Sequence, residues 1–252
     1  MKAHIQNVVT HFKGQCYAWD VVNEAFGDGD GSYRDSVFSS TIGPAYIPIA
    51  FEAAAAADPD AKLYYNDFNL EISPDKASAV VDLVKDLQAR KLRIDGIGFQ
   101  GHLVVGATPT RSAMAASLKR FTDLGLEVAY TEVDIRHDSL PASSTALAQQ
   151  AQDYTALVGS CLDVPKCVGI TLWQFTDKYS WVPQSFKGKG DALLWTSDYQ
   201  TKPAYDAVMT LLRAASNSTT NGTTTGKSAA GRPSTSAVGG ILGAALSAWL
   251  LL

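Results

Sequence analysis

The sequence has little of several residue types that would indicate particular classes of protein. It contains 3 cysteines in 252 residues, too few for a disulfide-rich scaffold, and no cysteine and histidine pair has the spacing of a zinc site. The formal net charge is −4 and basic residues form no block, so nothing favours a nucleic acid or an anionic membrane as partner. We therefore expect no metal and no cofactor, and a neutral ligand is the easier match.

We also expect no signal peptide in residues 1–12, because they have the spacing of a helix and not a charged start followed by an apolar core. An apolar run stands at the other end, in residues 237–252, and it suits a removable GPI-anchor signal better than a spanning helix. An uncleaved hydrophobic tail is the alternative. Residues 214–236 before it are rich in Ser, Thr, Asn and Gly, which predicts a disordered linker with N-glycosylation acceptors at Asn217 and Asn221. We expect an extracellular protein held at the cell surface.

What residues 1–213 do contain is a regular alternation of helix and strand patterns. Apolar strands are predicted at 16–22, 62–66, 94–100, 126–131 and 168–173. Helices are predicted at 4–12 and 47–57, after the caps Ser73-Pro74 and Thr108-Pro109, from Ser143 or Ser144 to Cys161, and from Pro203 to near Arg213. Repeats of about 30 to 45 residues fit βα units, so the sequence predicts an α/β fold with a parallel sheet.

Side chains with useful chemistry follow the ends of these predicted strands. Glu24 follows the first strand, in WDVVNEAF, and Glu132 follows the strand that is predicted to end at Thr131. Asn66, Gln100 with His102, and Trp173 hold the same position on the other strands. Because the carboxyl ends of parallel strands meet at one edge, where ligands bind, we expect these side chains to lie close together.

Two glutamates in this arrangement suit the cleavage of a glycosidic bond. One carboxylic acid protonates the leaving oxygen, while a carboxylate on the other face attacks the sugar or activates water. Either glutamate alone is more simply a solvated loop residue or a helix-start carboxylate, so the pairing carries the interpretation. We expect Glu24 and Glu132 to face each other across one cleft, about 5 Å apart as a retaining mechanism requires.

Other residues are expected to support this pair. The His102 ring could reach a carboxylate while Asp134 orients it, although a satisfied core histidine is the alternative. Trp173 and Trp181, in LWQFTDKYSW, could wall a sugar ring, although aromatic residues near a sheet edge are often core. Amide side chains could bind sugar hydroxyls or could tie down a loop. The expected substrate-binding residues are Asn23, Asn66, Gln100, His102, Trp173 and Trp181.

Five segments together resemble a known family. WDVVNEAF, LYYNDFNLE, GIGFQGHL, TEVDIR and LWQFTDKYSW, in this order, look like the fourth to eighth strand ends of the glycoside hydrolase family 10 endo-1,4-β-xylanases. The resemblance implies a (β/α)8 TIM barrel and retaining double displacement, with Glu24 as acid/base and Glu132 as nucleophile. It implies that His102 and Asp134 support the nucleophile. Cys161 and Cys167, which flank a Pro-containing loop, are similar to a disulfide of fungal members.

The chain departs from the family pattern, which begins with three further βα units. Residues 1–213 are therefore expected to form a partial barrel with about the last five units, and we interpret the chain as an incomplete gene model; a non-working remnant is the alternative. We expect a monomer that acts on β-1,4-xylan or a related plant cell-wall polysaccharide. The alternatives are a β-1,4-glucanase of the same fold and a catalytically inactive carbohydrate-binding fragment.

Overall fold

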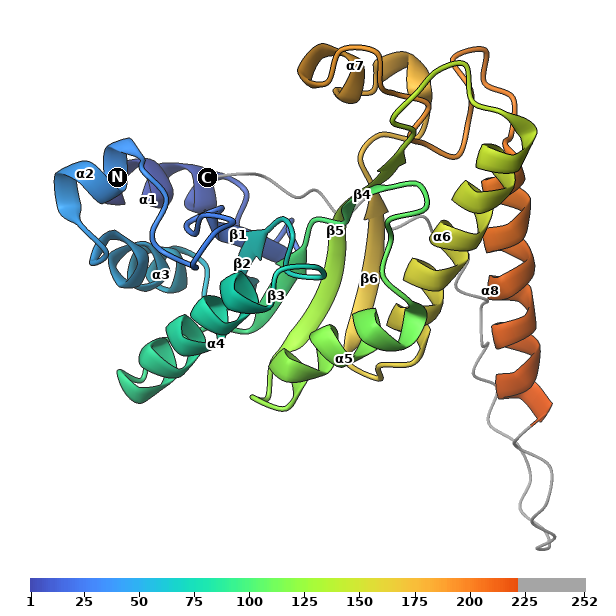
Figure 1. The fold of residues 1–252 in the computed structure, drawn as a ribbon. Coiled ribbons are helices and arrows are strands. Elements are labelled where there is room, and N and C mark those ends of the chain that lie inside the picture. The colour runs from blue at the N-terminus through green and yellow to red at the C-terminus, as the bar shows by residue number, and fades with distance from the viewer. Residues whose placement is uncertain (222–252) are drawn as a thin grey trace, which may run out of the picture.

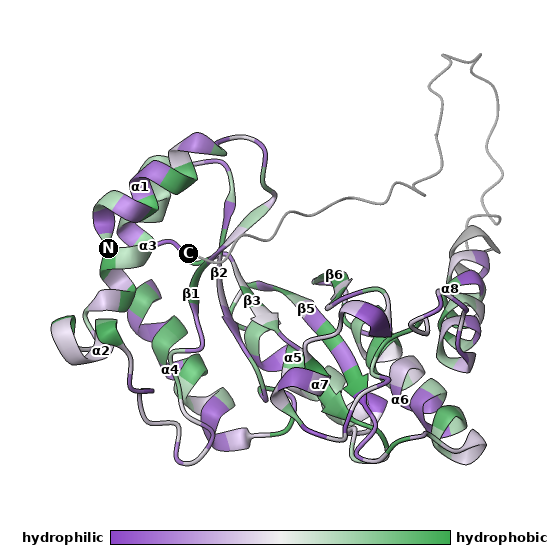
Figure 2. Cartoon of the chain, turned by 90° about the horizontal axis from the view of Figure 1, so that it is seen from above, coloured by the Kyte–Doolittle hydropathy of each residue, from purple (hydrophilic) through white to green (hydrophobic). Residues whose placement is uncertain are grey.

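The computed structural model describes residues 1–221, with side chains described through residue 217. Parallel strands pair in the order β1 (Ala18–Asn23), β2 (Lys62–Asp67), β3 (Gly96–Phe99), β5 (Glu127–Arg136) and β6 (Cys167–Leu172). A short sixth strand, β4 (His102–Val104), pairs with the far end of β5. The strands form an arc with the helices around its outer side (Figure 2). This arrangement confirms the predicted partial barrel of βα units.

The long helices follow the predicted alternation, as Figure 1 shows. They are α1 (Lys2–His11), α3 (Tyr46–Ala57), α4 (Pro74–Ala89), α5 (Arg111–Thr122), α6 (Ser144–Leu162) and α8 (Pro203–Asn221). The hydroxyl of Ser73 accepts from the Lys76 N–H and that of Ser143 from the Ala146 N–H, so these two of the three predicted helix starts are confirmed, the last of them at Ser143. Three short helical segments in loops were not predicted: α2 (Val37–Ile42), α7 (Val182–Ser185) and the 3-10 helix Asp177–Tyr179.

Two predicted helix boundaries are wrong. Helix α5 is capped by Thr110, whose hydroxyl accepts from the Ala113 N–H, because Thr108 instead donates its hydroxyl to the Val104 carbonyl and closes the turn after β4. Helix α8 continues past Arg213 to Asn221, since it packs along α6 and its alanines favour the helix. The first part of the predicted linker 214–236 is thus helical. The rest of the linker and the predicted anchor signal at 237–252 lie outside the described residues.

Strand β5 is longer than predicted, so Glu132 lies within the strand and not after it. The reason is a second pairing partner. Strand β3 ends at Phe99, but the Gln100 carbonyl accepts from the Glu132 N–H at 3.0 Å and the Gly101 carbonyl from the Asp134 N–H at 3.3 Å. After this step, where Gly101 has a φ of 76°, β4 continues the pairing. The interrupted strand therefore keeps β5 extended through both carboxylates.

The outer face of the sheet packs against the helices to form the main core, whose largest members include Trp19, Phe51 and Phe121. The inner face holds larger side chains because β3 carries glycines there. A Cβ atom at Gly98 would lie 2.1 Å from Oδ1 of Asn66, and one at Gly96 would lie 2.3 Å from the ring of Tyr64. The GIG sequence thus makes room for the Asn66 side chain at the site.

The predicted disulfide is present between Cys161, near the end of α6, and Cys167, at the start of β6. Cys16 has a free thiol. Within residues 1–221, no helix is both long and apolar enough to cross a membrane.

Candidate active site

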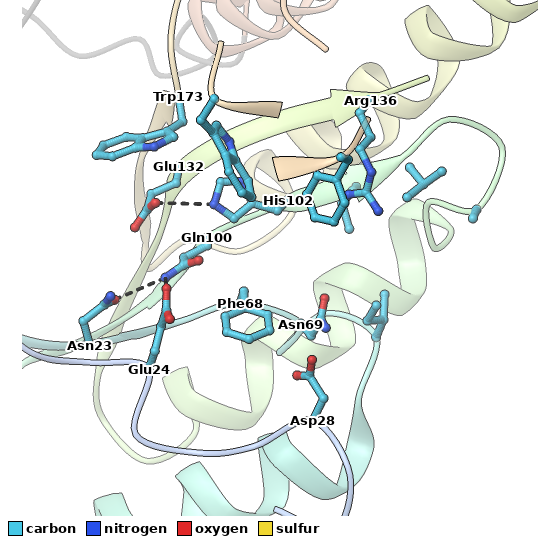
Figure 3. Close-up of a pocket in the computed structure, with 16 residues that line it drawn as sticks. Asn23, Glu24, Asp28, Phe68, Asn69, Gln100, His102, Glu132, Arg136 and Trp173 are labelled. Carbon is cyan, nitrogen blue, oxygen red and sulfur yellow. Dashed lines mark hydrogen bonds and ion pairs between the residues drawn. The ribbon is translucent and has the colours of Figure 1, made fainter. Parts of the chain in front are cut away.

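A pocket of about 680 Å³ opens at the carboxyl ends of the strands, and both Glu24 and Glu132 line it (Figure 3). Its volume is in the range of small-molecule sites. Predicted residues that also line it are Asn23, Gln100, His102, Trp173 and Trp181. The shared cleft that the sequence predicts for the two glutamates is confirmed.

The Glu132 carboxylate has two side-chain partners, Asn66 and His102. Its Oε1 accepts a hydrogen bond of 2.9 Å from Nδ2 of Asn66, and its Oε2 lies 3.4 Å from Nε2 of His102. Asn66 is fully buried and does not line the pocket, which differs from its expected role as a substrate contact. The Thr131 hydroxyl donates to Oδ1 of Asn66 at 2.6 Å and fixes the amide. Asn66 therefore orients the carboxylate and does not contact the pocket.

His102 links Glu132 to a deeper carboxylate. Its Nδ1 lies 3.0 Å from Oδ2 of the fully buried Asp134, which confirms the predicted orientation of the ring. The indole N–H of Trp181 donates to the same oxygen at 2.7 Å. Burial lowers the pKa of His102, but hydrogen bonds to Asp134 and Glu132 outweigh this effect and raise the pKa to about 9. The imidazole is therefore a cation at neutral pH, and its Nε2 lies beside the Glu132 carboxylate.

Glu24 is the first residue after β1 and has a φ of 55°, an uncommon conformation for a residue with a side chain. The backbone is fixed there, since the Glu24 N–H donates to the Asn66 carbonyl at 2.9 Å. Its carboxylate accepts from Nε2 of Gln100 at 3.1 Å and forms an ion pair with Arg34. Burial raises the pKa of Glu24, but the hydrogen bonds from Gln100, Arg34 and Asn23 and the Arg34 charge together lower it.

Side-chain amides connect the two glutamates. Asn66, which contacts Glu132, also donates to Oδ1 of Asn23 at 2.9 Å. Gln100, which contacts Glu24, donates to the same Asn23 oxygen at 3.2 Å (Figure 3). The amides of Asn23 and Gln100 therefore lie in the pocket as predicted and are already ordered by each other.

Aromatic side chains form part of the pocket wall. Trp173 follows β6, and Trp181 precedes α7. The Trp181 ring meets His102 edge to face at 5.0 Å between centroids and Phe186 at 5.6 Å, so it is held on two sides. Both tryptophans line the cavity, where the sequence predicts walls for a sugar ring.

The sequence analysis missed several residues of the site. Arg34 contacts Glu24 from the loop after β1, and Asp28 of the same loop lines the pocket. The fully buried ammonium of Lys76 lies 2.8 Å from Asp67 and 3.1 Å from Asp28, so it ties this loop to α4 and β2. The Gly and Asp residues of GDGDGS predict a turn between Glu24 and Arg34. This turn is the one sequence feature that indicates that Arg34 could lie near Glu24. Other lining residues that were not predicted are Phe68, Asn69, Ile72, Leu103, Val104, Ala107, Arg136 and Phe186.

Known proteins resemble the chain over nearly all of the described part. The profile of the family described as "Glycosyl hydrolase family 10" matches residues 1–211. "Endo-1,4-beta-xylanase 5" of Pyricularia oryzae is 57% identical over 215 residues, which are 85% of this chain and 53% of that protein. "Endo-1,4-beta-xylanase 1" of Humicola insolens is 57% identical over 212 residues, 84% of this chain and 49% of that protein. The chain thus spans about half the length of the curated relatives it matches.

Solved structures show the same likeness. The "endo-1,4-beta-xylanase XylE" of Penicillium canescens has a TM-score of 0.82 and 42% identity, over 84% of this chain and 65% of that chain. A xylanase of Bispora sp. MEY-1, solved with xylobiose, has a TM-score of 0.81 and 42% identity, over 83% of this chain and 66% of that chain.

Proposed function

The chain belongs to glycosyl hydrolase family 10, and from that premise we propose that the protein hydrolyses internal β-1,4-xylosidic linkages of xylan with retention of configuration. The observation that carries the proposal is the pair of carboxylates, Glu24 and Glu132, on one pocket and in different environments. Relatives named endo-1,4-beta-xylanases and a neighbour solved with xylobiose support xylan as the substrate.

In the first step, the Glu132 carboxylate attacks the anomeric carbon and Glu24 donates its proton to the departing glycosidic oxygen. The contacts to Glu132 suit a nucleophile, because the Asn66 amide and the His102 ring fix the position of its carboxylate. This chemistry needs the two carboxyl groups about 5 to 5.5 Å apart. The product of the step is a glycosyl ester on Glu132 and a free leaving chain.

In the second step, Glu24, now without its proton, removes a proton from water as the water attacks the anomeric carbon. The ester bond to Glu132 breaks, and Glu24 regains its proton. Trp173 and Trp181 would wall the sugar during both steps. The Asn23 amide nitrogen would donate to sugar hydroxyls and the Gln100 amide oxygen would accept from them, because the Gln100 amide nitrogen already donates to Asn23 and Glu24. Two inversions at the same carbon give net retention.

The test compares release of reducing ends from xylan and from cellulose, with the anomeric configuration of the first product followed by proton NMR. We expect release from xylan, a β-configured first product, and loss of both in a Glu132→Gln variant. Greater release from cellulose would support the β-1,4-glucanase alternative. A folded protein that is inert on both polymers but retained by insoluble xylan would support the inactive carbohydrate-binding alternative.

We also propose that the protein is a monomer, N-glycosylated at Asn217 and Asn221 and held outside the cell by a GPI anchor. The two Asn-x-Thr acceptors and the apolar residues 237–252 support this placement. Expression in a fungal host behind a secretion signal tests it. Phosphatidylinositol-specific phospholipase C should release the protein from the membrane, and a peptide N-glycosidase should reduce its mass. Protein that resists release, or that keeps residues 237–252, would contradict the anchor.

A further inference from the structure

Arg34 contacts Glu24, although neither step of the proposed reaction requires a cation there. A short hairpin places Arg34 next to Glu24. The Arg34 N–H donates to the Ala25 carbonyl at 2.8 Å, and the rings of Phe26 and Tyr33 stack at 4.9 Å between centroids. Residue 34 therefore lies beside residue 24 because residues 25–34 fold on themselves.

The outgoing side of the hairpin is also fixed. The Ser39 hydroxyl donates to the Arg34 carbonyl at 3.0 Å, and Ser36 and Ser39 form the capping box of α2. The Arg34 backbone is thus held on both sides, and its side chain is left to reach the carboxylate. The side chains of Arg34 and Glu24 are 48% and 28% exposed, so the ion pair lies at the rim of the pocket.

The other charged groups near Glu24 have partners of their own. On the same loop, Asp28 is paired with Lys76 of α4. On β5, Glu132 is paired with His102 of β4, and the guanidinium of Arg136 lies 4.3 Å from the ring of Phe186. The contact from the end of β3 comes from the neutral amide of Gln100. Among the described residues, Arg34 is the cation that forms an ion pair with Glu24.

We propose that Arg34 is a positioning residue that holds the Glu24 carboxylate in its ionised form. The inference rests on the proposed acid/base role of Glu24. In the first step Glu24 gives a proton to the glycosidic oxygen, and in the second it takes one from water. Arg34 favours the ionised form that the second step needs and opposes the protonated form that the first step needs.

The first test is a carboxyl carbon-13 NMR titration of Glu24 in this chain. Replacing Arg34 by Gln (R34Q) should raise the midpoint of Glu24. Arg34→Lys, which keeps the charge, should restore part of the shift. Arg136→Gln is the matched control, because it removes one positive charge from the lining of the pocket without removing a partner of Glu24. An unmoved Glu24 midpoint in R34Q, or an equal shift in the control, would overturn the proposal.

The second test is the pH profile of kcat/KM on xylan, which separates this inference from the proposed function. R34Q should move the alkaline limb to higher pH, since Glu24 must be protonated to act as the acid, and should leave the acidic limb unchanged. An alkaline limb that stays in place while the NMR midpoint moves would overturn the positioning role, because the Arg34–Glu24 pair would then not affect the reaction. An inactive wild-type protein would refute the proposed hydrolase function, while the titration would still decide the ion pair.

Discussion

The two glutamates of the pocket differ in how the fold holds them. Glu132 lies within a strand that is hydrogen-bonded on both sides, and its side chain is 10% exposed. Glu24 is the first residue beyond a strand, has a positive φ, and its side chain is 28% exposed. Glu132 contacts a buried amide and an imidazole, whereas Glu24 contacts an amide and a guanidinium at the rim.

This difference matches the different demands of the two proposed roles. A nucleophile must stay ionised and keep one position, which a buried strand with fixed donors provides. An acid/base group must lose and regain a proton in each cycle, which requires access to solvent and partners that can be displaced. The contrast therefore supports the roles proposed for Glu132 and Glu24 on grounds that do not depend on the family pattern.

The largest expected effect comes from removing the strand-held carboxylate. Glu132→Gln should reduce kcat on xylan by about 10⁴-fold or more, because no covalent intermediate can form. Added azide should not restore activity on xylan, since the glutamine side chain still fills the place from which an external anion would have to attack. Reducing-end assays measure the loss. Activity within about tenfold of the wild type would show that the nucleophile lies elsewhere.

The matching change at the rim should be smaller and depend on the substrate. Glu24→Gln should slow xylan hydrolysis by about 10²- to 10⁴-fold, the range of general acid–base catalysis. An aryl xylobioside with a good leaving group needs no acid, so it should still form the intermediate in a burst and then hydrolyse slowly. Azide should speed the second step and give a β-xylobiosyl azide. If Glu24→Gln and Glu132→Gln behave alike on the aryl substrate, the assignment of different roles is wrong.

Removing the imidazole of His102 should affect the position of the Glu132 carboxylate and leave the contacts of Glu24 in place. His102→Gln should lower kcat about tenfold, the size of one hydrogen bond to a charged group. The pKa of His102 rises from 6.5 to about 9 on folding, so its cation stabilises the fold fully below pH 6.5, and this contribution is lost as the pH rises through 9. The difference in Tm between wild type and variant should shrink across that window.

The control for this experiment is His4→Gln, which changes an exposed histidine of α1. Its Tm should follow that of the wild type at every pH. A Tm difference for His102→Gln that stays constant from pH 5 to 10 would contradict a cationic His102 in the fold.

The smallest expected effect is structural. In Gly98→Ala the new Cβ would lie 2.1 Å from Oδ1 of Asn66 and 2.8 Å from Cγ2 of Thr131, so the amide that orients Glu132 must move. We expect a loss of about 1 to 3 kcal/mol in the free energy of unfolding, measured by urea denaturation. Gly169→Ala on β6 is the matched control, since its Cβ would meet nothing within 4 Å. Equal losses in both variants would show that glycine removal itself, and not the contact with Asn66, is the cause.

Much of the site could be predicted because it depends on local patterns. Apolar alternation marks where a strand ends, and Glu24, Gln100 and His102 follow such ends directly. The caps at Ser73 and Ser143 are equally local. Once the sheet was recognised as parallel, its topology brought these side chains to one edge.

The features that sequence reasoning missed depend on contacts between distant segments. Strand β5 continues past Thr131 because β4 pairs with its far end, and no local pattern shows that pairing. Arg34 reaches Glu24 through a hairpin whose turn type the sequence does not specify. Lys76 has the position of a solvated helix-start lysine, and its burial depends on Asp67 and Asp28. Asn66 was expected in the pocket but is covered by its neighbours.

The interruption between β3 and β4 at Gln100 and Gly101 also determines which parts of the pocket can change in related proteins. Gln100, His102, Glu132 and Asp134 all lie on one line of backbone pairing along β5, so main-chain geometry sets their spacing. The loops that carry Asp28, Asn69 and Phe186 border the same cavity from outside this line. Exchange of those loops can therefore alter which ligands fit, while the spacing of these four residues along β5 is unchanged.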